Sequence, residues 1–266
     1  MKISDITRVL EDLAPLPYQE AYDNCGLLLG TEEDECRAAM VSLDATEPVV
    51  EEAAKKGCNL LITHHPLIFK GLKQISRHTG TGRAIIAAIK REIAVYAIHT
   101  NLDNVLPGVN TAIAAKLGLE DRQFLQPKTE SAREGQAGAG SGLIGELRQP
   151  LNENQFFSLL QEQFRVPVIR HSPLTGRMVK RVAVCGGAGS FLITNALALK
   201  ADFFITADIR YHEFFEAEGR LVLADIGHYE SEQFTMDLIC DAIHEKFPNF
   251  AVLKAGTATN PVNYYL

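Results

Sequence analysis

The stretch CNLLITHHP, residues 58–66, decides the fold of this 266-residue chain. Its nearly continuous apolar run is typical of a strand that is buried on both faces of a parallel sheet. Similar runs stand at AAMVSLDATE, residues 38–47, and at IAVYAIHTNLD, residues 93–103. The segments between the runs, residues 47–57 and 82–91, have apolar residues at helical spacing. We therefore predict a β-α-β-α-β unit with a mostly parallel sheet in the first half.

The second half repeats this order. KRVAVCGGAGS, residues 180–190, predicts a strand that ends in glycines, and residues 191–201 predict a helix. Further strands are predicted at 202–212 and at 220–232, with a short helix between them. The α/β chain is thus expected to hold two related β-α-β-α-β units.

A segment without apolar periodicity separates the halves. PKTESAREGQAGAGSG, residues 127–142, is rich in Gly, Ala and Ser and predicts a flexible loop. We therefore expect a first α/β lobe over 1–126, a second over 143–266, and no separate insert domain. The second lobe opens with a predicted strand, GLIGELRQP, and a predicted helix, NENQFFSLLQEQF, capped by Asn152 or Asn154.

Composition narrows the class of protein. Hydrophobic residues make up 46% and charged residues 22%, as in ordinary globular proteins. No run approaches the ~20 apolar residues of a membrane-spanning helix, and residues 1–23 predict an amphipathic helix without the apolar core of a secretory signal. The five cysteines are odd in number and form no CxxC pair, which indicates reduced thiols, with Cys185 and Cys240 in the core. We expect a cytoplasmic protein that has no membrane partner.

The net charge of −7 argues against nucleic acid as a partner, because nucleic-acid-binding proteins usually carry a basic stripe. One loose basic cluster is more typical of a solvated helix face than of a phosphate site. It comprises Lys70, Lys73, Arg77, Arg83, Lys90 and Arg91.

Reactive side chains gather where three predicted strands end. Ligands of parallel α/β sheets bind beyond the carboxyl ends of the strands. His64 and His65 end the second strand, His99 and Asp103 follow the third, and the last strand runs into DIGHYESE, residues 225–232. Four of the eight histidines fall at these three ends.

Adjacent His64 and His65 are unusual at a strand end. A single histidine there is most often a structural polar residue. Because neighbouring side chains diverge, we expect that one ion would rarely take both, whereas two ions ~3.5–4 Å apart could take one each. Imidazole suits Zn, Fe, Mn or Ni.

His228 and Glu232 are four residues apart at the start of a predicted helix, so they share one helix face and could hold one metal site. The alternative is an exposed polar first turn. Asp103 could likewise be a turn or N-cap residue. Together the three histidines and two carboxylates fit a dinuclear hydrolytic site better than a structural zinc site, which favours cysteine.

Other polar groups are weaker candidates for a functional role. The glycine-rich stretch 185–190 could offer backbone N–H groups to an anion, or could serve tight packing. His99, Asp208, Tyr211 and His212 could support the ligands or carry protons, and a structural role is the alternative for each. We expect His78, His171 and His244 to be surface residues.

Several strings together resemble one known family. They are AYDNCGLLLG, ITHHPLIFKGLK, YAIHTNLDNVLPGVN, VAVCGGAGS, FFITADIRYHE, DIGHYESE and TNPVNYYL, which extend over nearly the whole chain. The family is the NIF-three-like family, whose members are often labelled GTP cyclohydrolase 1 type 2 homologues.

This resemblance implies an α/β fold, a ring-like homohexamer and two divalent metal ions per chain, Zn, Fe or Mn. By the same resemblance, His65 and Asp103 bind one ion, His64 and His228 bind the other, and Glu232 bridges them. The expected function is a metal-dependent hydrolase for a small-molecule substrate, with His99 or His212 as proton carrier. A metal carrier or sensor, or a ring-shaped adaptor without turnover, is the alternative.

Overall fold

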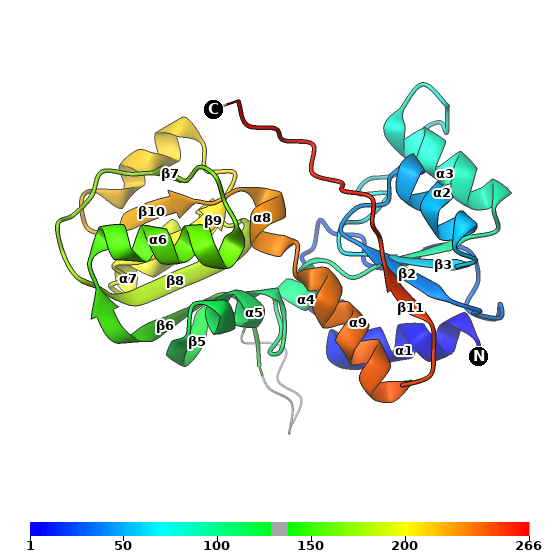
Figure 1. Cartoon of the computed structure of the whole chain (residues 1–266), viewed down its shortest axis with the longest axis horizontal. Coiled ribbons are helices and arrows are strands. Elements are labelled where there is room, and N and C mark those ends of the chain that lie inside the picture. The colour runs from blue at the N-terminus through cyan, green and yellow to red at the C-terminus, as the bar shows by residue number, and fades with distance from the viewer. Residues whose placement is uncertain (129–137, 266) are drawn as a thin grey trace. The chain divides into compact units, whose positions relative to one another are not determined.

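The structure is a computed structural model that describes residues 1–128 and 138–265. The chain divides into two compact units, and each is built on its own β-sheet with helices packed against it (Figure 1). Unit 1 comprises Met1–Leu102 and Thr235–Asn263, and unit 2 comprises Asp103–Phe234 with the last residues, Tyr264–Leu266. The predicted mixed α/β class is confirmed.

The sheet of unit 1 has the strand order β1-β4-β3-β2-β11. Its strands are β1 (Gly26–Leu29), β2 (Ala39–Ser42), β3 (Leu60–Thr63), β4 (Ala94–Ala97) and β11 (Val252–Lys254). β4, β3, β2 and β11 run parallel, whereas the edge strand β1 is antiparallel to β4. Hence the carboxyl ends of β3 and β4 lie together, and the start of β1 lies beside the end of β4.

Helices cover both faces of this sheet (Figure 1). They are α1 (Ile3–Leu13), α2 (Glu47–Lys55), α3 (Gly80–Lys90) and α9 (Thr235–Lys246), with the 3-10 turn η1 (Leu16–Tyr18). Met40, Leu61 and Val95 point to one face and pack with α2 and α3. Tyr96, the next residue along β4, points to the other face, where its hydroxyl lies 3.4 Å from Glu11 of α1. The alternation of side chains along each strand thus supplies two core layers.

The sheet of unit 2 has the order β5-β6-β8-β9-β10-β7. Its strands are β5 (Leu119–Lys128), β6 (Ala139–Leu151), β7 (Arg170–His171), β8 (Val179–Ala188), β9 (Phe203–Ala207) and β10 (Val222–Asp225). β8, β9 and β10 run parallel, and the other pairings are antiparallel. The parallel part is the predicted second β-α-β-α-β unit.

The helical elements of unit 2 include one with the predicted cap. They are α5 (Val109–Lys116), α6 (Glu153–Phe164), α7 (Ile193–Ala198) and α8 (His228–Glu232), with 3-10 turns η2 (Ser190–Leu192) and η3 (Tyr211–Ala217). The short helix α4 (Thr100–Asp103) spans the boundary of the two units. Asn152 begins α6 by accepting a hydrogen bond from Gln155 N, as one of the two predicted caps requires.

The division into units differs from the predicted boundaries. β5 pairs with β6, so the segment after Leu102 belongs to unit 2. At the other end of the chain, β11 pairs with β2, so the C-terminal segment belongs to unit 1. Backbone pairing between distant segments determines which unit each segment belongs to. Local composition carries no information about such pairing, so it could not predict these boundaries.

Both ends of the segment predicted as a loop, residues 127–142, form strand. Residues 127–128 extend β5 and 139–142 begin β6, while 129–137 lie outside the described residues. Gly140 and Gly142 fit this strand because a Cβ at either position would lie within 2.9 Å of a neighbouring side chain. These glycines allow close strand packing, which composition alone presents as flexibility.

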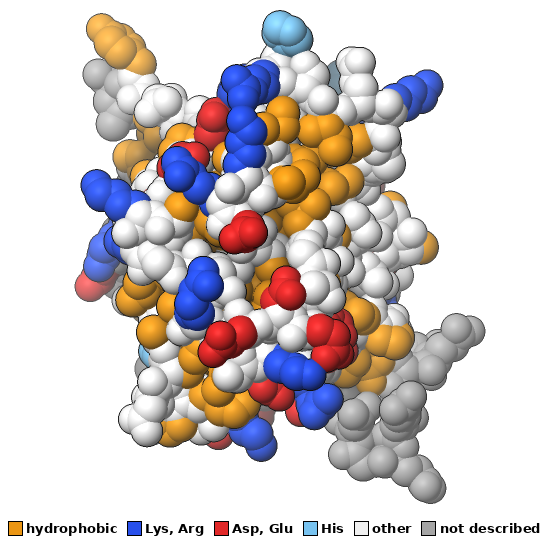
Figure 2. Space-filling view, turned by 90° about the vertical axis from the view of Figure 1, so that its right-hand side faces the viewer, with side chains coloured by type: hydrophobic (Ala, Val, Ile, Leu, Met, Phe, Trp, Pro, Cys, Tyr) orange, Lys and Arg blue, Asp and Glu red, His pale blue; other side chains and the backbone are white. Residues whose placement is uncertain are grey.

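Other expectations from composition hold. All five cysteines are free, and Cys185 and Cys240 are buried as predicted. The described helices are each too short or too polar to cross a bilayer. On the face drawn in Figure 2, Lys and Arg side chains are interspersed with Asp and Glu. Within the basic cluster, Arg83 pairs with Glu47 and Arg91 with Glu51, as on a solvated helix face.

Candidate metal centre

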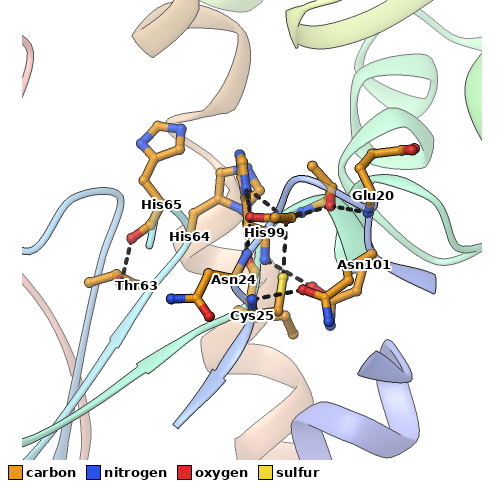
Figure 3. Close-up of polar contacts among 12 residues, drawn as sticks. Glu20, Asn24, Cys25, Thr63, His64, His65, His99 and Asn101 are labelled. Carbon is orange, nitrogen blue, oxygen red and sulfur yellow. Dashed lines mark hydrogen bonds and ion pairs between the residues drawn. The ribbon is translucent and has the colours of Figure 1, made fainter. Parts of the chain in front are cut away.

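Three histidines of unit 1 lie together beyond the carboxyl ends of β3 and β4. His64 and His65 directly follow β3, and His99 follows β4 by two residues. Each offers a ligand atom, and these atoms all lie within 4.8 Å of one another, so the cluster could hold a metal ion. The ring centroids are separated by 5.0 Å for His64 and His65 and by 5.2 and 5.4 Å from these rings to His99. Figure 3 shows the three side chains at the strand ends.

The expected divergence of His64 and His65 is not observed. Strand β3 ends at Thr63, and the chain bends there. The Thr63 hydroxyl donates to His65 O at 2.8 Å, while His65 N donates to Leu43 O at 2.9 Å. Side chains alternate only within a strand, so the bend brings both rings to one side.

Each histidine of this cluster has its Nδ1 against an acceptor. His64 Nδ1 lies 2.9 Å from the carbonyl oxygen of Ile98, and His65 Nδ1 lies 2.8 Å from Asp44 Oδ1. His99 Nδ1 lies 2.9 Å from both carboxylate oxygens of Asp23. A neutral imidazole that donates from Nδ1 carries its lone pair on Nε2. This is the tautomer and outer support typical of metal-binding histidines.

Asp23 is the central anion behind His99. Its side chain is fully buried and also accepts from the backbone N–H and the hydroxyl of Thr100. Burial opposes its ionisation, but the hydrogen bonds from His99 and Thr100 outweigh burial and hold the pKa of Asp23 well below its usual range. A permanent carboxylate therefore orients the His99 ring.

Unit 2 holds a second cluster around His228, the first residue of α8. His228 Nδ1 lies 2.8 Å from Asp208 Oδ2, and His228 Nε2 lies 3.1 Å from Glu232 Oε2. Burial lowers the pKa of His228, but the hydrogen bonds and charges of the two carboxylates outweigh this and raise it to about 11. The pair four residues apart on one helix face is thus confirmed, and Glu232 is buried instead of lying in an exposed first turn.

The glycine-rich stretch 185–190, at the end of β8, packs against this cluster. A Cβ at Gly187, whose φ is +60°, would lie 2.4 Å from Glu232 Oε1 and 3.3 Å from His228 Cε1. Three backbone N–H groups of the stretch are already used. Gly186 N donates to Asn110, Gly187 N to Ser231 and Gly189 N to Thr206. Of the two alternatives, the structure supports packing over anion binding.

Asp103 belongs to unit 2 and sits at the end of α4. Its backbone carbonyl accepts from Asn110 Nδ2 at 3.0 Å. Burial raises the pKa of Cys185, and the negative charges of Asp103 and Glu232 raise it further. Both carboxylates therefore act on the same buried thiol, which brings two of the predicted ligands into one neighbourhood.

The remaining histidines lie elsewhere. His212 and Tyr211 are exposed on η3, where the rings of His212, Tyr211 and Phe215 contact one another. Within residues 1–128 and 138–265, His212 makes no hydrogen bond, ion pair or ring contact with His228 or Glu232. His78, His171 and His244 are exposed, as predicted.

Asp23 and Asp44 contact the histidine cluster, and sequence reasoning did not single them out. Asp44 lies two residues after β2, at the same sheet edge as His65. Its position after an apolar strand could have identified it. Asp23 precedes β1, and only the antiparallel pairing of Gly26 with Ala97 brings it to His99.

Comparisons with known proteins agree with these features. The model of the family Duf34/NIF3 (NGG1p interacting factor 3) matches residues 1–261. A Clostridium acetobutylicum protein named GTP cyclohydrolase 1 type 2 homolog is 34% identical over 269 residues, which cover 99% of each chain. A relative of the same name from Lactococcus lactis is 33% identical, with 98% of each chain covered.

Solved structures show the same fold. The crystal structure of a Bacillus cereus protein related to NIF3 superposes with a TM-score of 0.91 at 23% identity, over 100% of this chain and 99% of that one. The crystal structure of a Staphylococcus aureus protein gives a TM-score of 0.89 at 27% identity, with the same coverage.

Proposed function

This chain belongs to the Duf34/NIF3 family, and from that premise we propose that it is a hydrolase that depends on two divalent metal ions. The proposed ligands are His64, His65, Asp103, His228 and Glu232. Imidazole and carboxylate together suit Zn, Fe or Mn, and a set without thiolate is typical of catalytic sites more than of structural zinc sites.

One observation carries this proposal. Each of the three proposed histidine ligands has its Nδ1 against a carbonyl or carboxylate oxygen, at 2.8–2.9 Å. Such outer partners fix the tautomer and raise the basicity of a metal-binding imidazole. A histidine outside the site can make the same contact, as His171 Nδ1 does with Ser172 O at 2.8 Å. What favours metal binding is that all three predicted histidine ligands have it.

When bound, the ions would supply Lewis acidity and lower the pKa of a coordinated water. The residues of the chain would supply orientation and proton transfer. Asp44 and Asp208 hold the rings of His65 and His228, and Asp23 holds that of His99. His99 is the better placed of the two proposed proton carriers, because its ring contacts those of two proposed ligands, whereas His212 is exposed on η3.

The proposed substrates are small molecules with a hydrolysable ring or ester. Relatives named GTP cyclohydrolase 1 type 2 homolog make the opening of a purine ring the first candidate. Cyclic amides and phosphoesters offer the same kind of electrophilic centre to metal-bound water. We further propose a cytoplasmic homohexamer. The free cysteines support the compartment, and the family resemblance supports the assembly, which light scattering would check.

The test is metal content together with turnover. Chain purified without a His-tag and reconstituted with Zn, Fe or Mn would be compared with Glu232→Ala and with the exposed control His78→Ala. We expect about two ions per wild-type chain, loss of metal and of hydrolysis in Glu232→Ala, and no change in the control. Two ions without hydrolysis of GTP, cyclic amides or phosphoesters would favour a metal carrier or adaptor. No stoichiometric metal would refute the site.

A further inference from the structure

The loop that follows the paired histidines leaves apolar side chains in solvent. It comprises residues 66–79, between β3 and α3 of unit 1. Its first part is buried, because Leu67 belongs to the core cluster beneath α2 and α3. Large apolar side chains that are 45–53% exposed then follow within seven residues: Phe69, Leu72 and Ile75. Apolar surface that gathers in this way marks a contact site, whereas single exposed apolar residues are ordinary.

Phe69 lies directly against the proposed proton carrier. Its ring stands edge-on to that of His99, with the ring centroids 5.7 Å apart and an interplanar angle of 87°. The residue before it is fixed to the segment that precedes β1, because Asn24 Nδ2 donates to Ile68 O at 2.6 Å. An exposed phenyl ring is thus held at a fixed place beside the histidine cluster.

The loop is also basic in an acidic protein. Between Glu52 and Glu92 the chain contains no acidic residue, although its net charge is −7. In this stretch Arg83 has an acidic partner from α2, whereas Lys70 and Lys73 form no ion pair within residues 1–128 and 138–265. Both lysines are exposed and lie in the loop, not on a helix face. Lysine ammonium groups without an acidic partner are suited to bind phosphate or another anion as point charges.

We propose that Phe69, Lys70 and Lys73 form a substrate subsite beside the histidine cluster, and that Phe69 is a specificity-determining residue. The phenyl ring receives a flat aromatic or heteroaromatic ring, and the two lysines bind an anionic group that this ring carries, such as phosphate. The inference rests on the proposed function, which it deepens in two ways. It names a substrate class, and it places the charged end of the substrate on side chains of the chain and not on the metal ions.

A protein partner is the competing occupant of this surface. Because Phe69 contacts His99, a protein that covered Phe69 would also screen the histidine cluster from small molecules. A small ligand can instead lie on the phenyl ring and present its reacting atoms to the cluster. The chemistry proposed for the cluster therefore favours a small ligand over a docked protein.

Isothermal titration calorimetry of the metal-reconstituted chain tests the subsite with separate probes for its two parts. GTP has a flat ring and phosphates, guanosine has the ring without phosphate, and tripolyphosphate has phosphates without the ring. Phe69→Ala should raise the Kd at least ~5-fold for GTP and guanosine but not for tripolyphosphate. The double variant Lys70→Ala, Lys73→Ala should raise the Kd ~5-fold for GTP and tripolyphosphate but not for guanosine.

Matched variants control for the loss of an aromatic ring or a charge elsewhere. Phe215→Ala on η3 and Lys90→Ala on α3 each remove an exposed side chain of the same kind, and both should leave all Kd values unchanged. Phe69→Tyr should bind as wild type does, because it keeps the flat ring. Elemental analysis should find the wild-type metal content in every variant, since none of the substituted residues is a proposed ligand.

An unchanged Kd for GTP in Phe69→Ala would overturn the proposal, as would a metal-loaded wild type that binds none of the probes. An unchanged Kd together with an altered oligomeric mass in light scattering would assign Phe69 to an interface between copies of the chain instead. The proposed function fails on a different result. A wild type that binds GTP through Phe69 but holds no metal would refute the hydrolase and leave the subsite in place.

Discussion

Histidines of both clusters have Nδ1 against a carboxylate oxygen, but the two clusters differ in burial and in the number of carboxylates around the ring. In unit 1, the side chains of His65 and His99 are each 14% exposed, and each ring has one acceptor at Nδ1. In unit 2, His228 is 36% exposed and lies between two carboxylates, Asp208 and Glu232. In unit 1 each ring faces one acceptor group, whereas in unit 2 the two carboxylates raise the pKa of His228 to about 11, so a metal ion would have to displace its proton. The rings carried by strand ends are thus the more buried ones, and the ring carried by the helix turn has the stronger carboxylate environment.

The largest loss of metal binding is expected at Gly187, whose backbone lies against the side chain of Glu232. In Gly187→Ala, the new Cβ would lie 2.4 Å from Glu232 Oε1, and the carboxylate must move away. The positive φ adds ~1–2 kcal/mol of strain. Gly176→Ala is the matched control, since its φ is +71° and, among the described residues, no atom apart from its chain neighbours would lie within 4 Å of an added Cβ.

Gly187→Ala should therefore lose at least as much stability in urea unfolding as Gly176→Ala, and only Gly187→Ala should lose metal in elemental analysis. Equal metal content in the two variants would show that the position of Glu232 is unimportant, which would break the contrast between the clusters.

A smaller loss of metal affinity is expected when the carboxylates that orient the histidine rings are neutralised. Asp44→Asn and Asp208→Asn remove the charge behind His65 and His228, and each should weaken metal binding by ~10–100-fold. Asp44 is 34% exposed and Asp208 57%, so solvent screens Asp208 more. We expect Asp44→Asn to show the larger change in Kd by isothermal titration calorimetry.

Asp237→Asn, which removes an exposed partner of Lys254, is the control and should bind metal normally. The reverse order, with Asp208→Asn weaker in binding than Asp44→Asn, would mean that the helix-borne cluster dominates affinity.

The smallest expected effect is on the pH dependence of the stability of the metal-free chain. The folded-state pKa of His228 is raised to about 11, against ~6.5 for an unperturbed histidine. Because the pKa is raised, its contribution to stability is fully present below pH ~6.5 and is lost as pH rises towards 11. His228→Gln should thus flatten the alkaline decline in urea unfolding, whereas His244→Gln, at an exposed position, should not. An identical decline in all three proteins would rule out a charged His228.

Local patterns predicted the parallel strands and the polar residues at their carboxyl ends. The apolar runs of β2, β3 and β4 are buried, and His64, His65 and His99 lie beyond their ends as expected. The spacing of His228 and Glu232 also predicted a shared helix face. Such features depend on side-chain period and chain direction within a few residues, so a single sequence carries them.

Other features depend on pairing between distant segments. Asp23 meets His99, 76 residues further along the chain, only because β1 is antiparallel to β4. The bend after Thr63 turned two rings that strand alternation would have separated. Gly187 appeared to be a candidate for anion binding, yet its N–H serves Ser231 and its missing Cβ makes room for Glu232.

By itself, the sequence determined the α/β class, the order of strands and helices, and which chemical groups stand at the strand ends. These features depend on local periodicity and residue type. The tertiary structure decided which acceptor faces each Nδ1, that His99 joins His64 and His65, and that the C-terminal strand completes the first sheet. Those outcomes require contacts between residues remote in the chain, whose energies depend on the packed fold and not on any local pattern.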